Sequence, residues 1–249
     1  MAINAQSGIG RIRLFNDFCG VSNYLSLTND TAPAGDFYLG GESFEVATAG
    51  AVGLTSDGLS GVVELLTDAT DKDTVFIGTG CAFDVAKMAP IAVEARVRFS
   101  DLDAKAAFIG LTSILTVDEQ MDDIIDISSA TVVTVTAELA GFFLSSEFTD
   151  DEDWVMVFNG GTTTAETTVA NIDADDDAVA GEFQILRLEV DPNGTARWYI
   201  DGVLKQTKEG AVSTTTDFFV CCGVTANTTT AARMDVDYLL VEANRDWNA

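Results

Sequence analysis

The sequence LRLEVDPNGTARWYIDGVLKQT, residues 186–207, decides the fold class. Its two short strand-like runs, Leu186–Val190 and Ala196–Ile200, flank the turn sequence DPNG. The pair DG follows immediately at 201–202, and this pair favours a two-residue type I′ hairpin turn. Two turn signals around a five-residue strand predict a three-stranded antiparallel meander, which Val203–Thr207 completes.

The rest of the chain continues the β pattern. Ile91–Phe99 alternates apolar and polar residues with a period of two, which is typical of a half-buried strand. Short strands at close spacing, with turns throughout, predict an all-β fold of two antiparallel sheets packed as a sandwich or jelly roll. We expect an extended N-terminal arm at 1–10, one sandwich domain at 11–245 and a short tail at 246–249.

The charge balance argues against several partners. The chain has 13 basic and 40 acidic residues, a net charge of −27, which repels nucleic acid and anionic lipid. No stretch approaches the roughly 18 apolar residues of a membrane span. The N-terminus, MAINAQSGIGRIRLF, lacks the pattern of a secretion signal. We therefore expect neither nucleic acid nor membrane as a partner, and synthesis in a cytoplasm.

The absence of histidine and the cysteine spacing argue against common catalytic and metal sites. Without histidine the chain lacks the usual general base and the Ser-His and Cys-His pairs. Cys19, Cys81, Cys221 and Cys222 form no CxxC motif, which argues against zinc. We expect mostly buried thiols, with a Cys19–Cys81 disulfide as the alternative, and we expect Cys221 and Cys222 to point to opposite faces of a strand.

Several segments together resemble a known fold family. They are RLFNDFCG (13–20), IAVEARVRF (91–99), FIGLT (108–112), AGFFL (140–144), DWVMVFNGG (153–161), the meander with its RWYIDG core (197–202), and MDVDYLLVEANR (234–245). They resemble concanavalin A-like domains of the lectin and laminin-G type. The combination is similar to virion proteins of tailed bacteriophages that decorate or cement the capsid.

This resemblance implies a structural function. The chain would sit on the capsid surface of a virion, contact the major capsid protein, and self-associate, with a trimer favoured. Ile3, Ile9 and Trp247, in the arm and the tail, would contact partner subunits. The alternative is a lectin-like carbohydrate-binding module for adhesion to a host surface, with Trp154, Trp198, Tyr199 and Trp247 as candidate sugar platform residues.

Catalysis is the third and least favoured function. Glycoside hydrolases that resemble laminarinases carry an E-x-D-x-x-E strand, and this chain has no such pattern. Asp235 and Asp237 share a strand face by their i, i+2 spacing, but we interpret them as part of a polar outer face. We therefore expect no enzyme activity.

One loop matches the spacing of a calcium site in part. Its candidate ligands occupy positions 1, 3, 5, 7 and 12 of an EF-hand-like loop: Asn171, Asp173, Asp175, Asp177 and Glu182. Asp176 stands where the sharp turn requires glycine, and the flanks do not resemble helices. We expect a solvated acidic loop, with no bound metal or other cofactor.

Two further expectations concern strand faces. Trp198 and Ile200 share one face of their strand, and we expect that face to be core. Arg96 and Arg98 share the polar face of Ile91–Phe99. In so acidic a chain we expect them to pair with carboxylates on a neighbouring strand.

Overall fold

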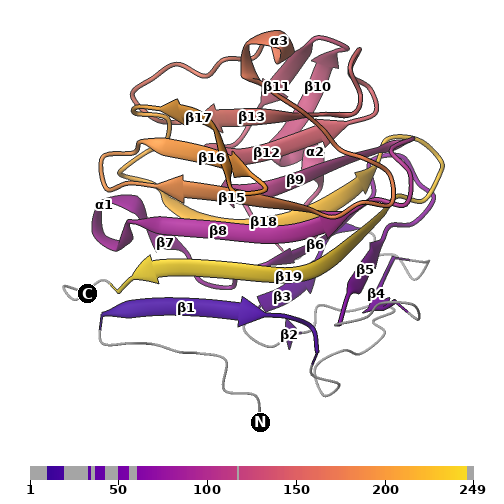
Figure 1. Cartoon of the computed structure of the whole chain (residues 1–249), viewed down its shortest axis with the longest axis horizontal. Helices are drawn as coiled ribbons and strands as arrows, with labels where there is room; N and C mark the ends of the chain where they lie inside the picture. The colour runs from indigo at the N-terminus through magenta and orange to yellow at the C-terminus, as the bar shows by residue number, and fades with distance from the viewer. Residues whose placement is uncertain are drawn as a thin grey trace.

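The computed structural model describes residues 10–19, 33–34, 37–42, 50–55, 61–116 and 118–245. The expected partner contacts Ile3, Ile9 and Trp247 lie outside these residues, so their role stays a prediction. Almost all of the regular secondary structure in the described residues is β strand. It forms two large antiparallel sheets, as Figure 1 shows.

The first sheet has the strand order β17-β16-β15-β8-β19-β5-β4, with β1 paired to β19. Its strands are β1 (Arg11–Asn16), β4 (Ala51–Leu54), β5 (Val63–Leu66), β8 (Ile91–Arg98), β15 (Gln184–Val190), β16 (Ala196–Ile200), β17 (Val203–Lys208) and β19 (Arg233–Asn244). The predicted meander is therefore confirmed as β15–β16–β17. Its DG turn has positive φ at Asp201 (49°) and Gly202 (79°), as a type I′ turn requires.

The second sheet has the order β14-β13-β12-β9-β18-β6-β3-β2, with β7 paired to β18. Its strands are β2 (Pro33–Ala34), β3 (Phe37–Gly40), β6 (Thr74–Gly78), β7 (Phe83–Asp84), β9 (Lys105–Thr112), β12 (Leu139–Ser145), β13 (Asp153–Asn159), β14 (Asp173–Asp177) and β18 (Asp217–Ala226). A short helix, α1 (Val85–Met88), joins β7 to β8.

The core lies between the two sheets. Trp154 and Trp198 are both 0% exposed, which confirms the expectation for Trp198. The Trp198 indole Nε1–H donates to the Gly141 carbonyl at 2.8 Å, and its ring lies 6.2 Å from that of Phe158. Trp198 on the first sheet thus packs against β12 and β13 of the second. The architecture is the predicted two-sheet jelly-roll sandwich.

A third layer covers the outer face of the second sheet, and this was not predicted. Every residue of β9 and β12 is buried, so both faces of these strands are covered. The covering segments include α2 (Met121–Ile124) and the hairpin of β10 (Ile125–Ser129) with β11 (Val132–Val135). A Cβ placed on Gly223 would lie 3.3 Å from the Met121 side chain, and one on Gly78 would lie 2.6 Å from Leu115.

The covering layer also explains the cysteines. Cys221 and Cys222 lie on opposite faces of β18, as expected, and both are buried because both faces of the sheet are covered. Cys19 and Cys81 are exposed, so the expectation of mostly buried thiols holds for only two of the four. All four cysteines lie among the described residues and are thiols, so the alternative Cys19–Cys81 disulfide is not formed.

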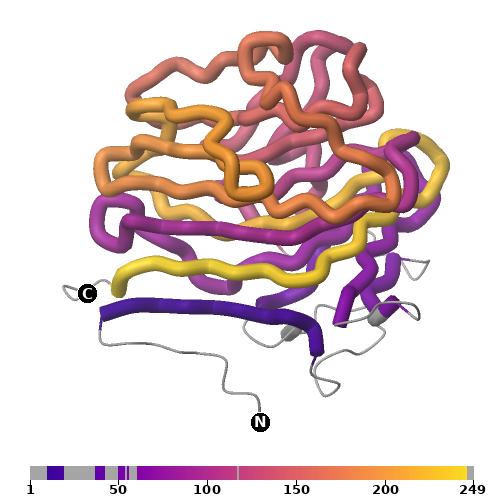
Figure 2. Tube along the Cα trace, viewed as in Figure 1, coloured from indigo at the N-terminus to yellow at the C-terminus, as the bar shows by residue number. Residues whose placement is uncertain are grey.

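The first and last strands of the sandwich lie side by side. Arg11 of β1 pairs with Asn244 of β19, and Arg13 pairs with Glu242, in an antiparallel register. Figure 2 shows this arrangement, with β1 in indigo beside β19 in yellow. The pairing brings residues from the two ends of the sequence onto one outer face, where they form one wall of the candidate site.

Candidate functional site

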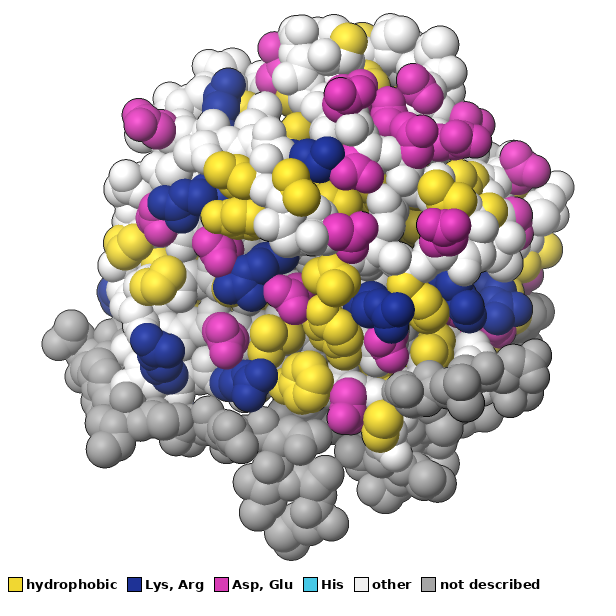
Figure 3. Space-filling model, viewed as in Figure 1, with side chains coloured by type: hydrophobic (Ala, Val, Ile, Leu, Met, Phe, Trp, Pro, Cys, Tyr) yellow, Lys and Arg dark blue, Asp and Glu magenta, His cyan; other side chains and the backbone are white. Residues whose placement is uncertain are grey.

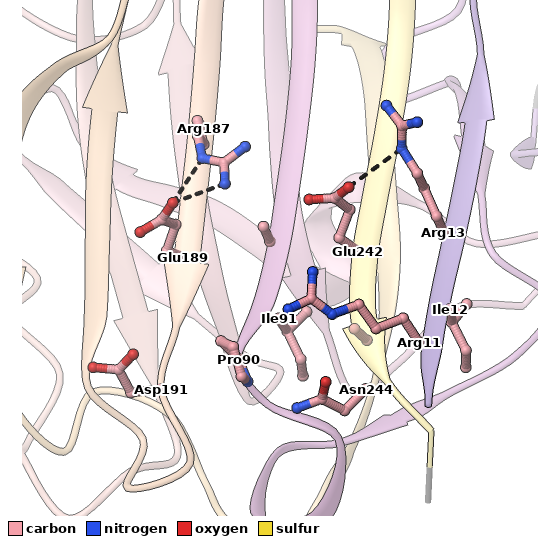
Figure 4. A pocket seen from close by; sticks show the side chains of 12 residues that line it. Arg11, Ile12, Arg13, Pro90, Ile91, Arg187, Glu189, Asp191, Glu242 and Asn244 are labelled. Atoms are coloured by element: carbon pink, nitrogen blue, oxygen red, sulfur yellow. Dashed lines mark hydrogen bonds and ion pairs between the residues drawn. The ribbon is translucent and has the colours of Figure 1, made fainter. Parts of the chain in front are cut away.

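A groove of about 450 Å³ opens on the outer face of the first sheet, at the end near α1. Four strands contribute to it: β1, β8, β15 and β19. Figure 4 shows charged side chains along its two sides and apolar residues between them. Because its walls are paired strands of one sheet, the groove has a rigid backbone frame.

The polar side chains of the groove are held by ion pairs. Arg13 Nε lies 3.2 Å from the Glu242 carboxylate on the neighbouring strand. On the other side, Arg187 contacts Glu94 at 2.9 Å and Glu189 at 2.8 Å. Burial lowers the pKa of Arg187, but its hydrogen bonds to these two carboxylates outweigh burial, so the net pKa is raised and the guanidinium stays charged.

The groove's end and floor complete the site. The Asn244 amide donates to the Ala89 carbonyl at 2.8 Å, and Asp191 accepts from Arg197 at 3.2 Å. Its apolar floor is formed by the exposed Pro90 and by Ala92, which faces outward at 8% exposure, whereas Ile91 and Ala243 beside them belong to the core. The site therefore offers an apolar floor bordered by fixed hydrogen-bond donors and acceptors.

Arginines concentrate on this face of an otherwise acidic chain. Figure 3 shows basic and hydrophobic side chains in a band across the first sheet, with acidic side chains gathered at the upper right of the view. The strands of this sheet carry Arg11, Arg13, Arg96, Arg98, Arg187, Arg197 and Arg233. The same strands also carry Glu64, Glu94, Glu189, Asp235, Asp237 and Glu242, so this face is much less negative than the chain as a whole.

The expectations for this face are confirmed. Arg96 is ion-paired with Asp237 and Arg98 with Asp235, both on the neighbouring strand β19. Both guanidinium groups also lie over the Phe183 ring, at 4.2 and 4.5 Å from its centroid. Asp235 and Asp237 are therefore structural partners on the outer face of the first sheet, as their spacing indicated.

The candidate calcium ligands of the sequence are not gathered at one point. Asp173, Asp175 and Asp177 lie on β14, and Asp176 between them pairs with Lys205 at 2.7 Å. Asn171 lies on α3 (Val169–Ile172), and Glu182 follows β14 as an exposed residue. Among the described residues, no group of three or more carboxylate or thiol side chains is placed to hold a metal ion.

A smaller cavity, of about 90 Å³, lies beside the covering layer. It is lined by part of the acidic stretch 118–126, which the structure forms as α2 and the start of β10. Lys72 lies 2.8 Å from Asp122 and 3.7 Å from Asp126. These contacts fasten the covering layer to the sandwich, so we interpret this cluster as structural.

Asp153, at the start of β13, is a buried carboxyl beside other acids. Burial first, then a hydrogen bond with Asp177 and the charges of Asp173 and Asp150, raise the pKa of Asp153 to about 8. The folded state therefore holds this proton more tightly than the unfolded chain. Stability from this group is present at low pH and is lost as pH rises from about 4 to about 8.

Asp153→Asn should remove this pH dependence. We expect the variant to melt at nearly the wild-type temperature at pH 4, and at a clearly higher temperature at pH 8, because the amide carries no charge to bury. Thermal melts across this range check it. Glu152→Gln, an exposed neighbour, is the control, and its melting temperature should differ from that of wild type by nearly the same amount at every pH. If the melting temperature of Asp153→Asn also differed from wild type by a constant amount, Asp153 would not be the source of the pH dependence.

The comparisons with known proteins establish the fold. No protein-family model and no curated protein sequence matches the chain. Among solved structures, the carbohydrate recognition domain of Emp46p has a TM-score of 0.56 and 12% identity, with coverage of 92% of this chain and 97% of that one. The β-glucanase of Bacillus licheniformis gives the same four values. A protein of unknown function from Shewanella oneidensis MR-1 has a TM-score of 0.57 and 13% identity, with 96% and 89% coverage.

These likenesses confirm the concanavalin A-like jelly roll that the sequence segments resembled. At such identities they show the fold alone. None of the three is described as a virion protein, so the capsid function stays a prediction. In the described part of the chain, no helix has the length and apolar character needed to cross a bilayer.

The groove residues were not predicted from the sequence as a site. They come from positions 11–13, 90–92, 187–191 and 242–244, and only strand pairing brings them together. A local signal was present in RIR at 11–13 and RLE at 187–189, where charged residues alternate with apolar ones. Such alternation marks a solvated strand face, which is not specific enough to identify a binding site.

Proposed function

We infer that the chain is a lectin-like carbohydrate-binding module and that the outer groove of the first sheet is its binding site. The observation that carries this proposal is the preorganised arginine–carboxylate network around an apolar floor. A sugar ring has an apolar face of C–H groups and an edge of hydroxyls, each of which donates and accepts. The groove matches both parts, with Pro90 and Ala92 below and Arg187, Glu189 and Asn244 at the sides.

Preorganisation favours this function. The Arg187 guanidinium is held by two carboxylates, and the Asn244 amide by a backbone carbonyl. Side chains fixed in this way lose little conformational entropy when a ligand binds. The carbohydrate recognition domain among the structural neighbours adds support at the level of the fold.

We further infer that the module does not cleave its ligand. Retaining glycoside hydrolysis requires two carboxyls about 5–5.5 Å apart, one of them an acid. On the outer face of the second sheet, the described strands β9, β12 and β18 carry glycine, hydrocarbon, hydroxyl and thiol side chains beneath the covering layer, and their one carboxylate, Asp217, is exposed at the start of β18. In the groove, Glu189, Asp191 and Glu242 are each ion-paired with an arginine, and so serve as fixed hydrogen-bonding groups.

A steric variant tests the location. Ala92 lies on the floor, opposite Glu189 on one neighbouring strand and Glu242 on the other. Ala92→Phe should fill the groove from below while leaving the core untouched, because this position faces outward. We expect wild type to bind members of a glycan array and the variant to lose that binding by at least about tenfold, with an unchanged fold by circular dichroism.

Ile185→Phe is the matched control. Ile185 lies on the same outer face, in register with Arg96 and outside the groove lining. Ile185→Phe places the same aromatic side chain on the same face, and we expect this variant to bind as wild type does. Wild-type binding by Ala92→Phe would place the ligand elsewhere, and no binding by wild type to any glycan would reject the proposed function.

A further inference from the structure

The groove lining carries three arginines and three carboxylates, but these charges are unevenly paired along its length. Arg13 and Glu242 form one pair, whereas Arg187 is shared by Glu94 and Glu189. Within the described ranges, Arg11 makes no ion pair, although it lines the groove. Arg245, next along the chain from the groove residue Asn244, likewise has no carboxylate partner among the described residues. The end of the groove near Asn244 thus holds cationic groups in excess of their partners.

Arg11 is placed to face a ligand. It lies on β1 in register with Asn244, and Figure 4 shows its side chain crossing β19 toward Ile91. Because Arg11 and Asn244 are paired in register, their side chains share the outer face of the first sheet, and in Figure 4 the guanidinium extends across the groove toward β8.

We propose that the groove takes an acidic saccharide, with the carboxylate or sulfate of one sugar held by Arg11. This rests on the proposed carbohydrate-binding function and names its ligand class. A guanidinium matches such an anion with two parallel N–H donors, and charge-assisted hydrogen bonds are about twice as strong as neutral ones. Glu189 and Asp191, at the other side of the groove, accept hydrogen bonds from the hydroxyls of the adjoining sugar.

The net charge of the chain does not prevent this. At physiological salt, charges beyond about 8 Å are largely screened, so the groups that line the groove decide the local field. There each lining carboxylate is already paired with an arginine, and Arg11 is left without a carboxylate partner among the described residues. The same screening confines the attraction for an anion to the groove itself. The ligand is therefore a saccharide with one or two acidic sugars, and a long polyanion would be repelled by the acidic surface around the groove.

Titration calorimetry with three oligosaccharides of equal length tests the proposal. One carries uronic acids, one carries sulfates, and one is neutral. At 0.15 M salt we expect at least one acidic ligand to bind about tenfold or more tightly than the neutral one. Arg11→Gln should weaken that ligand by about 10- to 100-fold and leave the neutral one nearly unchanged, as loss of a charged hydrogen bond predicts. The two acidic ligands distinguish a carboxylate from a sulfate.

Arg233→Gln is the matched control. It removes the same charge from the same sheet, at a position paired with Glu64 and outside the groove. It should leave both affinities unchanged. Equal binding of neutral and acidic ligands, or acidic binding that Arg11→Gln does not weaken, would overturn the inference while the proposed function stands. If no saccharide binds, the proposed function itself fails.

Discussion

Trp198→Ala should lower the free energy of unfolding by about 3–5 kcal/mol, the usual cost of removing a large buried aromatic side chain. Trp198 is fully buried, and its indole joins the two sheets through the hydrogen bond to Gly141. The substitution leaves a cavity and removes the hydrogen bond that joins the two sheets. Urea denaturation followed by circular dichroism would measure the loss, which should appear as a lower midpoint.

Tyr199→Ala is the control for this prediction. Tyr199 is the next residue of β16, faces outward, and contacts Glu189 through a long hydrogen bond of 3.3 Å. Tyr199→Ala should lower the free energy of unfolding by at most about 1 kcal/mol, as most surface substitutions do. Equal losses for the two variants would mean that Trp198 does not fill the core between the sheets.

Gly110→Ala should be nearly as damaging, although it adds only a methyl group. Gly110 lies in the middle of β9, where a Cβ would stand 2.3 Å from the Ala140 carbonyl oxygen and 2.5 Å from Gly141 Cα. These are backbone atoms, so no rotation of a side chain can relieve the clash. We expect the substitution to destabilise the fold by about 3 kcal/mol, at the upper end of typical overpacking. The denaturant midpoint measures this too.

Gly53→Ala makes the same change where there is room. A Cβ on Gly53 of β4 would meet no atom within 4 Å. We expect its stability to stay within about 1 kcal/mol of wild type, with a small gain from reduced freedom of the unfolded chain. If Gly110→Ala were as stable as Gly53→Ala, strands β9 and β12 would not approach as closely as described.

The sequence predicts a strand or turn where a short segment itself carries turn residues or an alternation of apolar and polar residues. The meander could be predicted because its turns require residues that tolerate positive φ, and DG at 201–202 supplies them. β8 could be predicted because its outer face is polar, which gives the clear alternation of Ile91–Phe99. The core position of Trp198 followed from the same alternation on β16.

The covering layer left a weaker signal. Lys105–Thr112 and Leu139–Ser145 are apolar runs without alternation, which is typical of strands buried on both faces. That composition indicates a third layer, but it does not say which segment supplies it. The covering segment 121–135 contains acidic residues and short apolar pieces. Its packing depends on contacts with residues that are far away in the sequence, such as the contact of Asp122 with Lys72.

The candidate site depends still more on long-range pairing. Arg13 and Glu242 are neighbours only because β1 pairs with β19 in one register. A shift of that register by one residue would turn these side chains to the opposite face. The sequence can suggest charged strand faces, but the groove is a product of the complete sheet.

Nuclear magnetic resonance of the protein titrated with its best-binding saccharide shows directly whether the ligand binds in the outer groove of the first sheet. We expect the largest amide shift changes at residues 11–13, 91–92, 187–191 and 242–244, around that groove. Shift changes confined to α2 and the β10–β11 hairpin, over the second sheet, would contradict this expectation.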